Sequence, residues 1–331
     1  MTYVFTFLGE FGYELFNWQG VIRKWIEENK NRDDKIVICS RKGLDQLYDF
    51  ADYYLDISSL ESYKKTIADC YTGYIFINDT NVEMPRREWQ LARSGNHIEE
   101  IKNDIKGVVS DKMTTDNIEW IWSCEYRKMN GLHFGLGGPG GGSIYTGRLN
   151  LSNNKYAKIE IKDYDKIYKN LKNKLNFDID KPYILCQTAW RKGYDHKCNK
   201  KINHEKIFSK MSNELPIVSL EFNTGRNNDS LSEINSVFIN QNCDSFDEQL
   251  VLIKNSKYCI FTTEGDFRSH TYIPPLLGKD VYVIASEKVL SFDQTSCKFW
   301  NENIFNFGGN MFTLSYEELL KNGNLEELLN D

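Results

Sequence analysis

Short apolar runs alternate with helical patterns along the chain, and the alternation predicts an α/β fold with parallel sheets. In the first half, "YVFTFLG", "KIVICS" and "GYIFIND" predict strands at 3–9, 35–40 and 73–79. Apolar residues at helical spacing predict helices at 13–29 and 43–57. The segment from about residue 96 to 122 is polar and irregular, with helical stretches.

The second half repeats the alternation after a strand-like piece and a lysine-rich amphipathic helix near 155–175. The pattern predicts strands at 183–189, 216–222, 257–263 and 280–286, with helices at 203–211 and 245–256. We therefore predict two Rossmann-like domains facing a cleft. The N-terminal domain is predicted at 1–150 and the C-terminal domain at 151–331.

Composition and charge narrow the class of protein. The 331 residues are 40% hydrophobic and 14% aromatic, as in ordinary globular proteins, and the net charge of −6 does not favour a nucleic acid partner. No stretch of about 18 apolar residues occurs, so we expect no transmembrane segment and a cytoplasmic location. The eight cysteines form no C-x-x-C pair, and we expect those in strand-like runs to be buried hydrophobes.

The segment "LGEFGYELF" carries the first candidate site, directly after the first predicted strand. Gly9 and Gly12 free the turn for a close approach of donor or acceptor, and the amides that begin the next helix carry partial positive charge. Glu10 and Glu14 are candidate general bases toward an acceptor hydroxyl if burial raises the pKa of one of them. Alternatively, both carboxylates simply complement the start of the helix.

The segment "CQTAWRKGYDHKCNKK" carries the second candidate site, after the predicted strand 183–189. Arg191 and Lys192 follow the strand end, where a guanidinium can grip a phosphate through two hydrogen bonds. Trp190 and Tyr194 suit a nucleotide base or sugar. A solvated basic loop is the alternative.

The segment "FTTEGDFRSHTYIPPLLGKDVYVIAS" carries the third candidate site. Its hydroxyl, acidic and basic groups suit phosphate or ribose recognition, although Thr263 or Ser269 can equally serve as a helix N-cap. The candidate donor-binding residues here are Thr263, Glu264, Gly265, Arg268 and Ser269, with His270 beside them.

A glycine-rich segment, 135–142, lies near the predicted domain boundary. It can be a flexible surface linker or a loop that wraps a ligand, and the sequence does not separate these two interpretations.

These residues resemble the GT-B glycosyltransferases, in particular their heptosyltransferase-like and fucosyltransferase-like members. The resemblance lies in "QTAWRKG", in "TTEGDFRSHTYIPPLLGKDVYVI" some seventy residues later, and in "LGEFGYEL". It implies that the C-terminal domain, 151–331, binds the donor and that the N-terminal domain, 1–150, forms the acceptor side. It also implies a basic loop that binds the diphosphate of the donor and a first turn that contributes a catalytic carboxylate. The heptosyltransferase pattern has Asp directly after the second glycine, whereas this chain has Tyr13 there and Glu14 one place later.

The resulting prediction is a glycosyltransferase that moves a sugar from a nucleotide-diphosphate sugar to a hydroxyl of a carbohydrate or other acceptor. An arginine and lysine clamp would neutralise the leaving diphosphate without a metal or other cofactor. The "DYD" at Asp163–Asp165 matches a metal-binding D-x-D in letters, but its place at the start of a lysine-rich helix favours a cap.

Three alternatives remain open from the sequence. A polysaccharide pyruvyl transferase would use phosphoenolpyruvate, with His270 as general acid beside Arg268. A non-catalytic carbohydrate-binding protein could have the same fold, because fold does not imply function. A nucleic acid acceptor is open but not favoured by the acidic balance.

Overall fold

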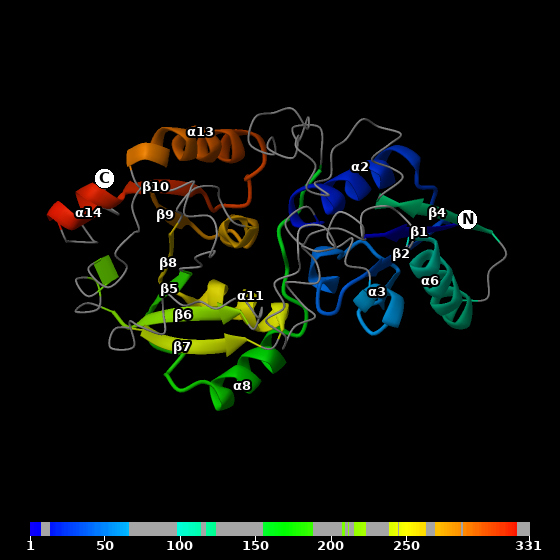
Figure 1. Cartoon of the computed structure of the whole chain (residues 1–331), viewed down its shortest axis with the longest axis horizontal. Coiled ribbons are helices and arrows are strands. Elements are labelled where there is room, and N and C mark those ends of the chain that lie inside the picture. Colours follow the sequence, from blue (N-terminus) through cyan, green and yellow to red (C-terminus); the bar gives the residue numbers. More distant parts are fainter. Residues whose placement is uncertain are drawn as a thin grey trace. The chain divides into compact units, whose positions relative to one another are not determined.

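The computed structural model describes two compact units, Met1–Tyr156 and Ala157–Asp331 (Figure 1). The predicted boundary after residue 150 lies outside the described residues, and the acceptor and donor roles of the two halves stay predictions. The structure describes residues 1–7, 14–65, 98–113, 117–123, 155–187, 207–208, 211, 215–222, 238–243, 245–262, 269–285 and 287–322. No helix in these ranges is both long and apolar enough to cross a lipid bilayer.

The first unit contains a parallel sheet of order β3-β2-β1-β4. Its strands are β1 (Thr2–Thr6), β2 (Lys35–Ser40), β3 (Tyr53–Asp56) and β4 (Ile118–Trp122). The register pairs Thr6 with Cys39 of β2 and with Trp122 of β4. The carboxyl ends of the three strands therefore meet at one edge of the sheet.

Helices cover both faces of this sheet, with α2 on one side and α3 and α6 on the other (Figure 1). After β1, a π-helical turn, η1 (Glu14–Trp18), continues into α2 (Gln19–Asn29), and Trp25 of α2 packs edge-on against Tyr3 and Phe5. The opposite face packs against α3 (Glu61–Lys65) and α6 (Ile98–Lys112). Its buried side chains are Val4, Val37, Cys39, Ile57, Tyr63, Ile101, Ile105, Val109 and Trp122.

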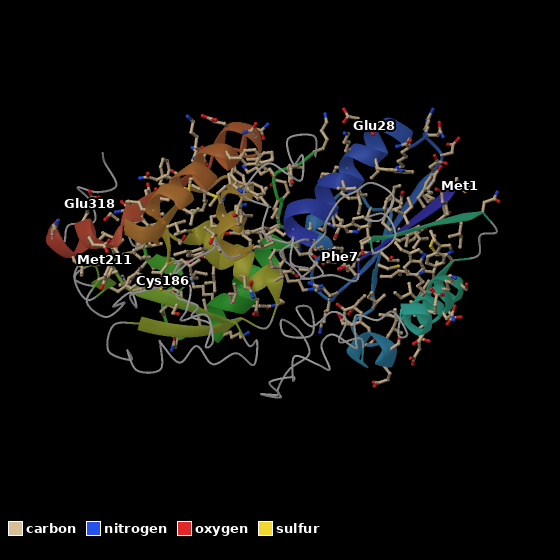
Figure 2. All side chains as sticks on the ribbon, turned by 45° about the horizontal axis from the view of Figure 1, so that its top comes forward. Met1, Phe7, Glu28, Cys186, Met211 and Glu318 are labelled. Carbon is tan, nitrogen blue, oxygen red and sulfur yellow. The ribbon has the colours of Figure 1, made fainter. Side chains whose placement is uncertain are left out.

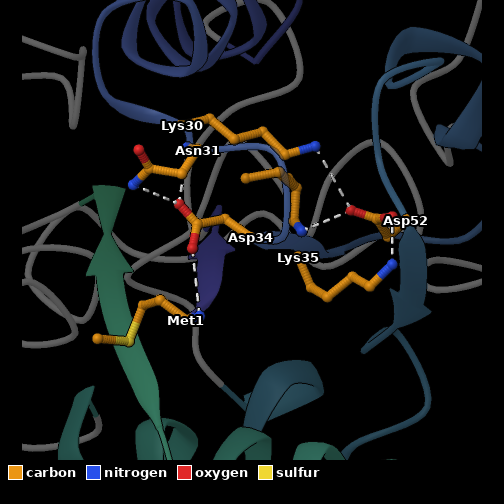
Figure 3. Close-up of polar contacts among 7 residues, drawn as sticks. Met1, Lys30, Asn31, Asp34, Lys35 and Asp52 are labelled. Carbon is orange, nitrogen blue, oxygen red and sulfur yellow. Dashed lines mark hydrogen bonds and ion pairs between the residues drawn. The ribbon is translucent and has the colours of Figure 1, made fainter.

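Carboxylates fix the amino edge of the first sheet (Figure 3). Asp34 accepts a hydrogen bond of 2.8 Å from the Asn31 amide and lies 3.2 Å from the Met1 amino group. Asp52 accepts a hydrogen bond of 2.8 Å from the Ile36 amide. The bond from the Asn31 amide is the main cause that lowers the pKa of Asp34. Both groups stabilise the turns that lead into β2 and β3 at the edge opposite the strand ends.

The second unit contains a parallel sheet of order β10-β9-β8-β5-β6-β7. Counted from the first strand of the unit, this is the 3-2-1-4-5-6 order of Rossmann folds, read from the other edge. The strands are β5 (Ile184–Gln187), β6 (Ile217–Phe222), β7 (Phe238–Cys243), β8 (Tyr258–Thr262), β9 (Val281–Ala285) and β10 (Met311–Ser315). With the first sheet, this confirms the predicted α/β class built from two Rossmann-like domains.

The core of the second unit lies on the faces of this sheet. The helices of the unit are α8 (Tyr164–Lys174), α11 (Phe246–Asn255), α12 (Ile273–Leu276), α13 (Glu287–Asn303) and α14 (Tyr316–Asn322), with the single turn η5 (Ser269–Tyr272) before α12. On one face, Cys186 and Met211 belong to the same buried cluster (Figure 2). Elsewhere, Tyr183 donates a hydrogen bond of 2.6 Å to the Leu252 carbonyl and so ties β5 to α11.

Several sequence predictions agree with this fold and one element is wrong. The strands predicted at 35–40, 216–222, 257–263 and 280–286 are confirmed as β2, β6, β8 and β9, and the cysteines Cys39, Cys186, Cys259 and Cys297 are buried free thiols. The helix predicted at 43–57 is instead a 3₁₀ turn, η2 (Asp45–Leu47), followed by β3. The strands β4, β7 and β10 were not among the predicted elements, and the predicted strand 73–79 lies outside the described residues.

The "LGKD" segment packs tightly at the amino end of β9. Gly278 has a positive φ of 77°, and a side chain at Gly309 would place its Cβ 2.4 Å from the backbone N and O of Lys279. Asp280 accepts a hydrogen bond of 2.9 Å from the Asn310 amide, and Lys279 donates one of 3.2 Å to the Lys254 carbonyl at the end of α11. This part of the resembling motif therefore serves packing, at the edge opposite the carboxyl ends of the strands.

We expect Gly309→Ala to lower the free energy of unfolding by about 1–3 kcal/mol, because its Cβ meets backbone atoms that cannot move aside independently. The matched control is Gly107→Ala, in the middle of α6, where a Cβ meets nothing within 4 Å. The control should raise stability by about 0.5–1 kcal/mol through helix propensity. Urea unfolding of both variants measures the difference, and equal effects would contradict the close backbone approach.

Candidate functional site

Glu14 lies at the centre of a buried polar cluster at the carboxyl edge of the first sheet. Phe7, which follows the end of β1 (Figure 2), donates its amide hydrogen to the Cys39 carbonyl at 3.1 Å. Ser40, the next residue of β2, donates its hydroxyl hydrogen to Glu14 Oε1. The start of η1 is thus held against the end of β2.

Three side chains contact the two oxygens of Glu14, whose side chain is fully buried. Oε1 accepts hydrogen bonds from Ser40 Oγ and, at 2.7 Å, from the Tyr48 hydroxyl. Oε2 lies 3.7 Å from Nη1 of Arg41, so the two charged groups form an ion pair with no exposed surface on either side chain. Burial of this kind is costly unless charges are paired and hydrogen-bonded. The cluster pairs the two charges and hydrogen-bonds Oε1, whereas Oε2 has no hydrogen-bond partner among the described residues.

Arg41 extends the cluster to other elements of the unit. Its Nε donates to the Tyr63 hydroxyl of α3 at 3.3 Å, and its guanidinium lies over the Phe7 ring, 5.7 Å from the centroid. Its backbone carbonyl accepts a hydrogen bond from the Tyr54 hydroxyl of β3. Arg41 therefore contacts Phe7 after β1 and Tyr63 of α3 through its guanidinium, and Tyr54 of β3 through its backbone carbonyl.

Burial dominates the electrostatics of this cluster. It raises the pKa of the Glu14 carboxyl, while Arg41 and the hydrogen bonds from Ser40 and Tyr48 act in the opposite direction. Burial also raises the pKa of Tyr48 well above its usual value, and the neighbouring Glu14 adds to the shift. Tyr48 therefore remains a protonated hydrogen-bond donor to Glu14 at neutral pH.

The second unit brings two distant segments of the sequence to one point of its sheet. The central strands β5 and β8 are neighbours, and the register pairs Gln187 with Phe261. β5 ends at Gln187 and β8 ends at Thr262, at adjacent positions on the carboxyl edge. The strand order reverses between β5 and β8, and ligands of open α/β sheets bind at such a switch point.

The structure describes only some of the predicted site residues. Glu14 is the catalytic candidate whose side chain the structure describes, and it is fully buried, with a pKa that this burial raises. Ser269 and His270 begin η5, and only their backbone is described. The other candidates lie outside the described residues: Gly9, Glu10, Gly12, Arg191, Lys192, Thr263, Glu264, Gly265 and Arg268.

Sequence reasoning missed the partners of Glu14. Ser40 is the last residue of the strand "KIVICS" and Arg41 directly follows it. A basic residue directly after so apolar a run was a signal that could have been used. Tyr48 was hidden because it lies in the segment predicted as a helix. Nothing in the spacing of the sequence pairs Tyr48 with Glu14, because their contact depends on how the sheet folds.

The described part of the chain contains no cluster of three or more side chains with metal-ligating groups. Asp163, the first residue of "DYD", occupies the N-cap position of α8 in a left-handed conformation with φ of 54°. Its side chain makes no capping hydrogen bond, so the predicted cap is right in position but not in contact.

Comparisons with known proteins agree with this fold. Neither a protein-family model nor a curated protein matches the chain in sequence. The structure is similar to E. coli ADP-heptose LPS heptosyltransferase II, with a TM-score of 0.52 and 9% identity over 100% of this chain and 99% of that chain. It is also similar to a family 9 glycosyl transferase from Veillonella parvula, with a TM-score of 0.50 and 8% identity over 98% of this chain and 91% of that one. At such identities the likeness shows the fold alone, and this is the predicted GT-B fold.

The raised pKa of Glu14 predicts how stability depends on pH. Burial raises the pKa of the Glu14 carboxyl in the folded protein above the value of about 4.3 that a glutamate has in the unfolded chain. The protonated carboxyl therefore stabilises the folded state fully below about pH 4.3, and this stabilisation is lost as the pH rises through the pKa of the folded state. The stability of the wild type relative to Glu14→Gln should therefore fall as pH rises from about 4.

Urea unfolding between pH 4 and 8 measures this difference. The matched control is Glu28→Gln on α2, the helix that continues from η1, where the side chain is 58% exposed. Because that side chain is exposed, the variant should differ from wild type by no more than about 0.5 kcal/mol at each pH. If the wild type instead becomes more stable relative to Glu14→Gln as the pH rises, the attraction of the carboxylate to Arg41 outweighs the cost of burying its charge.

Proposed function

We propose that this protein is a glycosyltransferase that moves a sugar from a nucleotide-diphosphate sugar to a hydroxyl acceptor. The observation that carries the proposal is the adjacency of the ends of β5 and β8 at the switch point of the second sheet. The segment after β5 contains Arg191 and Lys192, and the segment after β8 contains Thr263 and Arg268. Segments that follow two adjacent strand ends and carry cationic and hydroxyl side chains are suited to bind a diphosphate.

In the proposed reaction the acceptor oxygen forms a bond to the anomeric carbon of the sugar. The bond from that carbon to the diphosphate breaks, and the nucleoside diphosphate leaves with the bonding electron pair. A carboxylate of the segment that follows β1 takes the acceptor proton. Arg191 and Lys192 stabilise the negative charge on the leaving diphosphate, as fixed cations do in transition states of this kind.

The fold supports this proposal without deciding it, because the same architecture carries other chemistry. Heptosyltransferase II acts, by its name, with ADP-heptose, which is a nucleotide-diphosphate sugar. We extend that class of donor to this chain, and leave the base and the sugar to experiment.

A ligand screen tests the donor class. We expect one nucleoside diphosphate and its sugars to raise the unfolding temperature, because a ligand at one hundred times its dissociation constant adds about 2.7 kcal/mol of stability. The added stability should persist with EDTA present, since the proposed clamp consists of side chains. A shift with phosphoenolpyruvate alone would instead favour a pyruvyl transferase with His270 as acid, and no shift with any compound would contradict a donor site that binds on its own.

A pair of substitutions at the two ends of β5 tests the clamp. Arg191→Ala should weaken binding of the donor found in the screen by about 2–4 kcal/mol, the loss expected for a charge-assisted contact to phosphate. Lys181→Ala, which removes one positive charge before the amino end of β5 from a side chain that is 76% exposed, should leave binding unchanged. Equal affinity of both variants, measured by calorimetry, would reject Arg191 as a donor ligand.

A further inference from the structure

One edge of the second sheet offers its backbone to a further strand. In the described part of the chain β10 is the last strand of the order β10-β9-β8-β5-β6-β7, so one side of its backbone faces away from the sheet. We propose that this side of β10 is a pairing surface for β10 of a second copy of the chain, and that Asn301 of α13 prevents the pairing. The proposal concerns association and goes beyond the proposed sugar transfer.

Asn301 takes the place of a neighbouring strand at Met311. Its Nδ2 donates a hydrogen bond of 2.8 Å to the Met311 carbonyl, and its Oδ1 accepts one of 2.9 Å from the Met311 amide. A carboxamide carries both a donor and an acceptor, as a peptide group does. From α13, which runs beside β10 (Figure 1), this one side chain therefore satisfies both backbone groups of an edge residue.

The pairing of β10 with β9 shows which residues face outward. The Val281 amide donates a hydrogen bond of 2.9 Å to the Asn310 carbonyl, so that carbonyl faces β9. Backbone groups of successive residues in a strand point alternately to its two sides, and Met311 and Thr313 therefore face outward. Among the described residues, no side chain bonds to the backbone of Thr313 as Asn301 does to that of Met311.

The residues of this edge suit pairing with a copy of itself. The segment 306–315, "NFGGNMFTLS", contains no charged residue, so two copies of it bring no like charges together even though the net charge of the chain is −6. It also lacks the lysines and prolines that protect many edge strands. Phe312 is 40% exposed, and its ring stacks on that of Tyr282 at 5.3 Å. Side chains of an added strand would cover part of this aromatic surface.

A two-fold axis brings two copies of this edge together. It places the two β10 strands antiparallel, and each strand then meets the same donors and acceptors that it presents. Strand addition of this kind draws its affinity from main-chain hydrogen bonds. Asn301 has to leave Met311 before the pairing can extend along the whole strand. The two side-chain bonds of Asn301 therefore compete directly with association.

Sedimentation velocity of Asn301→Leu tests the proposal. Leucine has nearly the shape of asparagine but forms no hydrogen bonds, so the variant should associate as protein concentration rises, to a mass about twice that of wild type. The matched control is Asn303→Leu, two residues further along α13. The Asn303 side chain bonds to the Phe299 carbonyl of its own helix at 2.8 Å, and its loss should leave the mass at the wild-type value.

A second substitution identifies the edge that pairs. Thr313→Pro removes an outward-facing amide hydrogen, which an edge strand tolerates, because that amide makes no bond to β9. Added to Asn301→Leu, it should return the mass to the wild-type value. An unchanged mass in Asn301→Leu, equal association in Asn303→Leu, or association that persists with Thr313→Pro would each overturn the proposal.

Hydrogen exchange of the wild type tests the edge without any substitution, and so applies even if Asn301→Leu does not fold. At low protein concentration the Met311 amide, bonded to Asn301, should exchange more slowly than the outward-facing amide of Thr313. Equal protection of the two amides would show that the edge is already covered along its length, and would overturn the proposal.

Discussion

The buried pair of Glu14 and Arg41 is the interaction on which the arrangement of the first unit depends. A charge without exposed surface must find its partners inside the protein, since the alternative is the large cost of an unpaired ion in a medium of low polarity. The carboxylate meets this demand with a hydroxyl of β2, a tyrosine after η2 and the guanidinium. Breaking such a pair by removing one partner costs about 3–5 kcal/mol, so the elements that supply the partners are fixed relative to one another.

In each sheet, the amino edge and the carboxyl edge of the strands have different roles. At the amino edge of the first sheet, Asp34 and Asp52 accept backbone hydrogen bonds in the turns before β2 and β3. At the amino edge of the second, Gly278 and Gly309 allow two backbone segments to touch. The carboxyl edges carry the buried pair in one unit and the adjacent ends of β5 and β8 in the other. Parallel strands impose this division, because all of their carboxyl ends point the same way.

The fold class could be predicted from the sequence because strands buried on both faces leave continuous apolar runs, as in "KIVICS" and "DVYVIAS". The apolar pattern of the segment 43–57 led to a wrong prediction. Leu44, Leu47 and Tyr48 are spaced as on a helix and are buried, but the chain turns at Gly43, with φ of 79°, and then pairs with β2 as an edge strand. β7, "FINQNC", is an edge strand with polar residues and so lacks an apolar run.

The candidate site could be located from the sequence but not interpreted in full. The glycines and acidic residues after β1 marked the right edge of the sheet, whereas the burial of Glu14 depends on Arg41 and Tyr48, which the sheet brings to it from distant positions. Local spacing carries no information about such contacts.

The strand order of the second sheet also affects how the chain is made. β5 takes β6 on one side and β8 on the other, and about 75 residues separate the end of β5 from the end of β8. At the roughly 5–20 residues per second of protein synthesis, the ribosome needs about 4–15 seconds to deliver β8 after β5 has emerged. During that interval the edge of β5 that later pairs with β8 has no native neighbour. Nascent chains of this protein thus expose an open, apolar strand edge of the kind that chaperones protect.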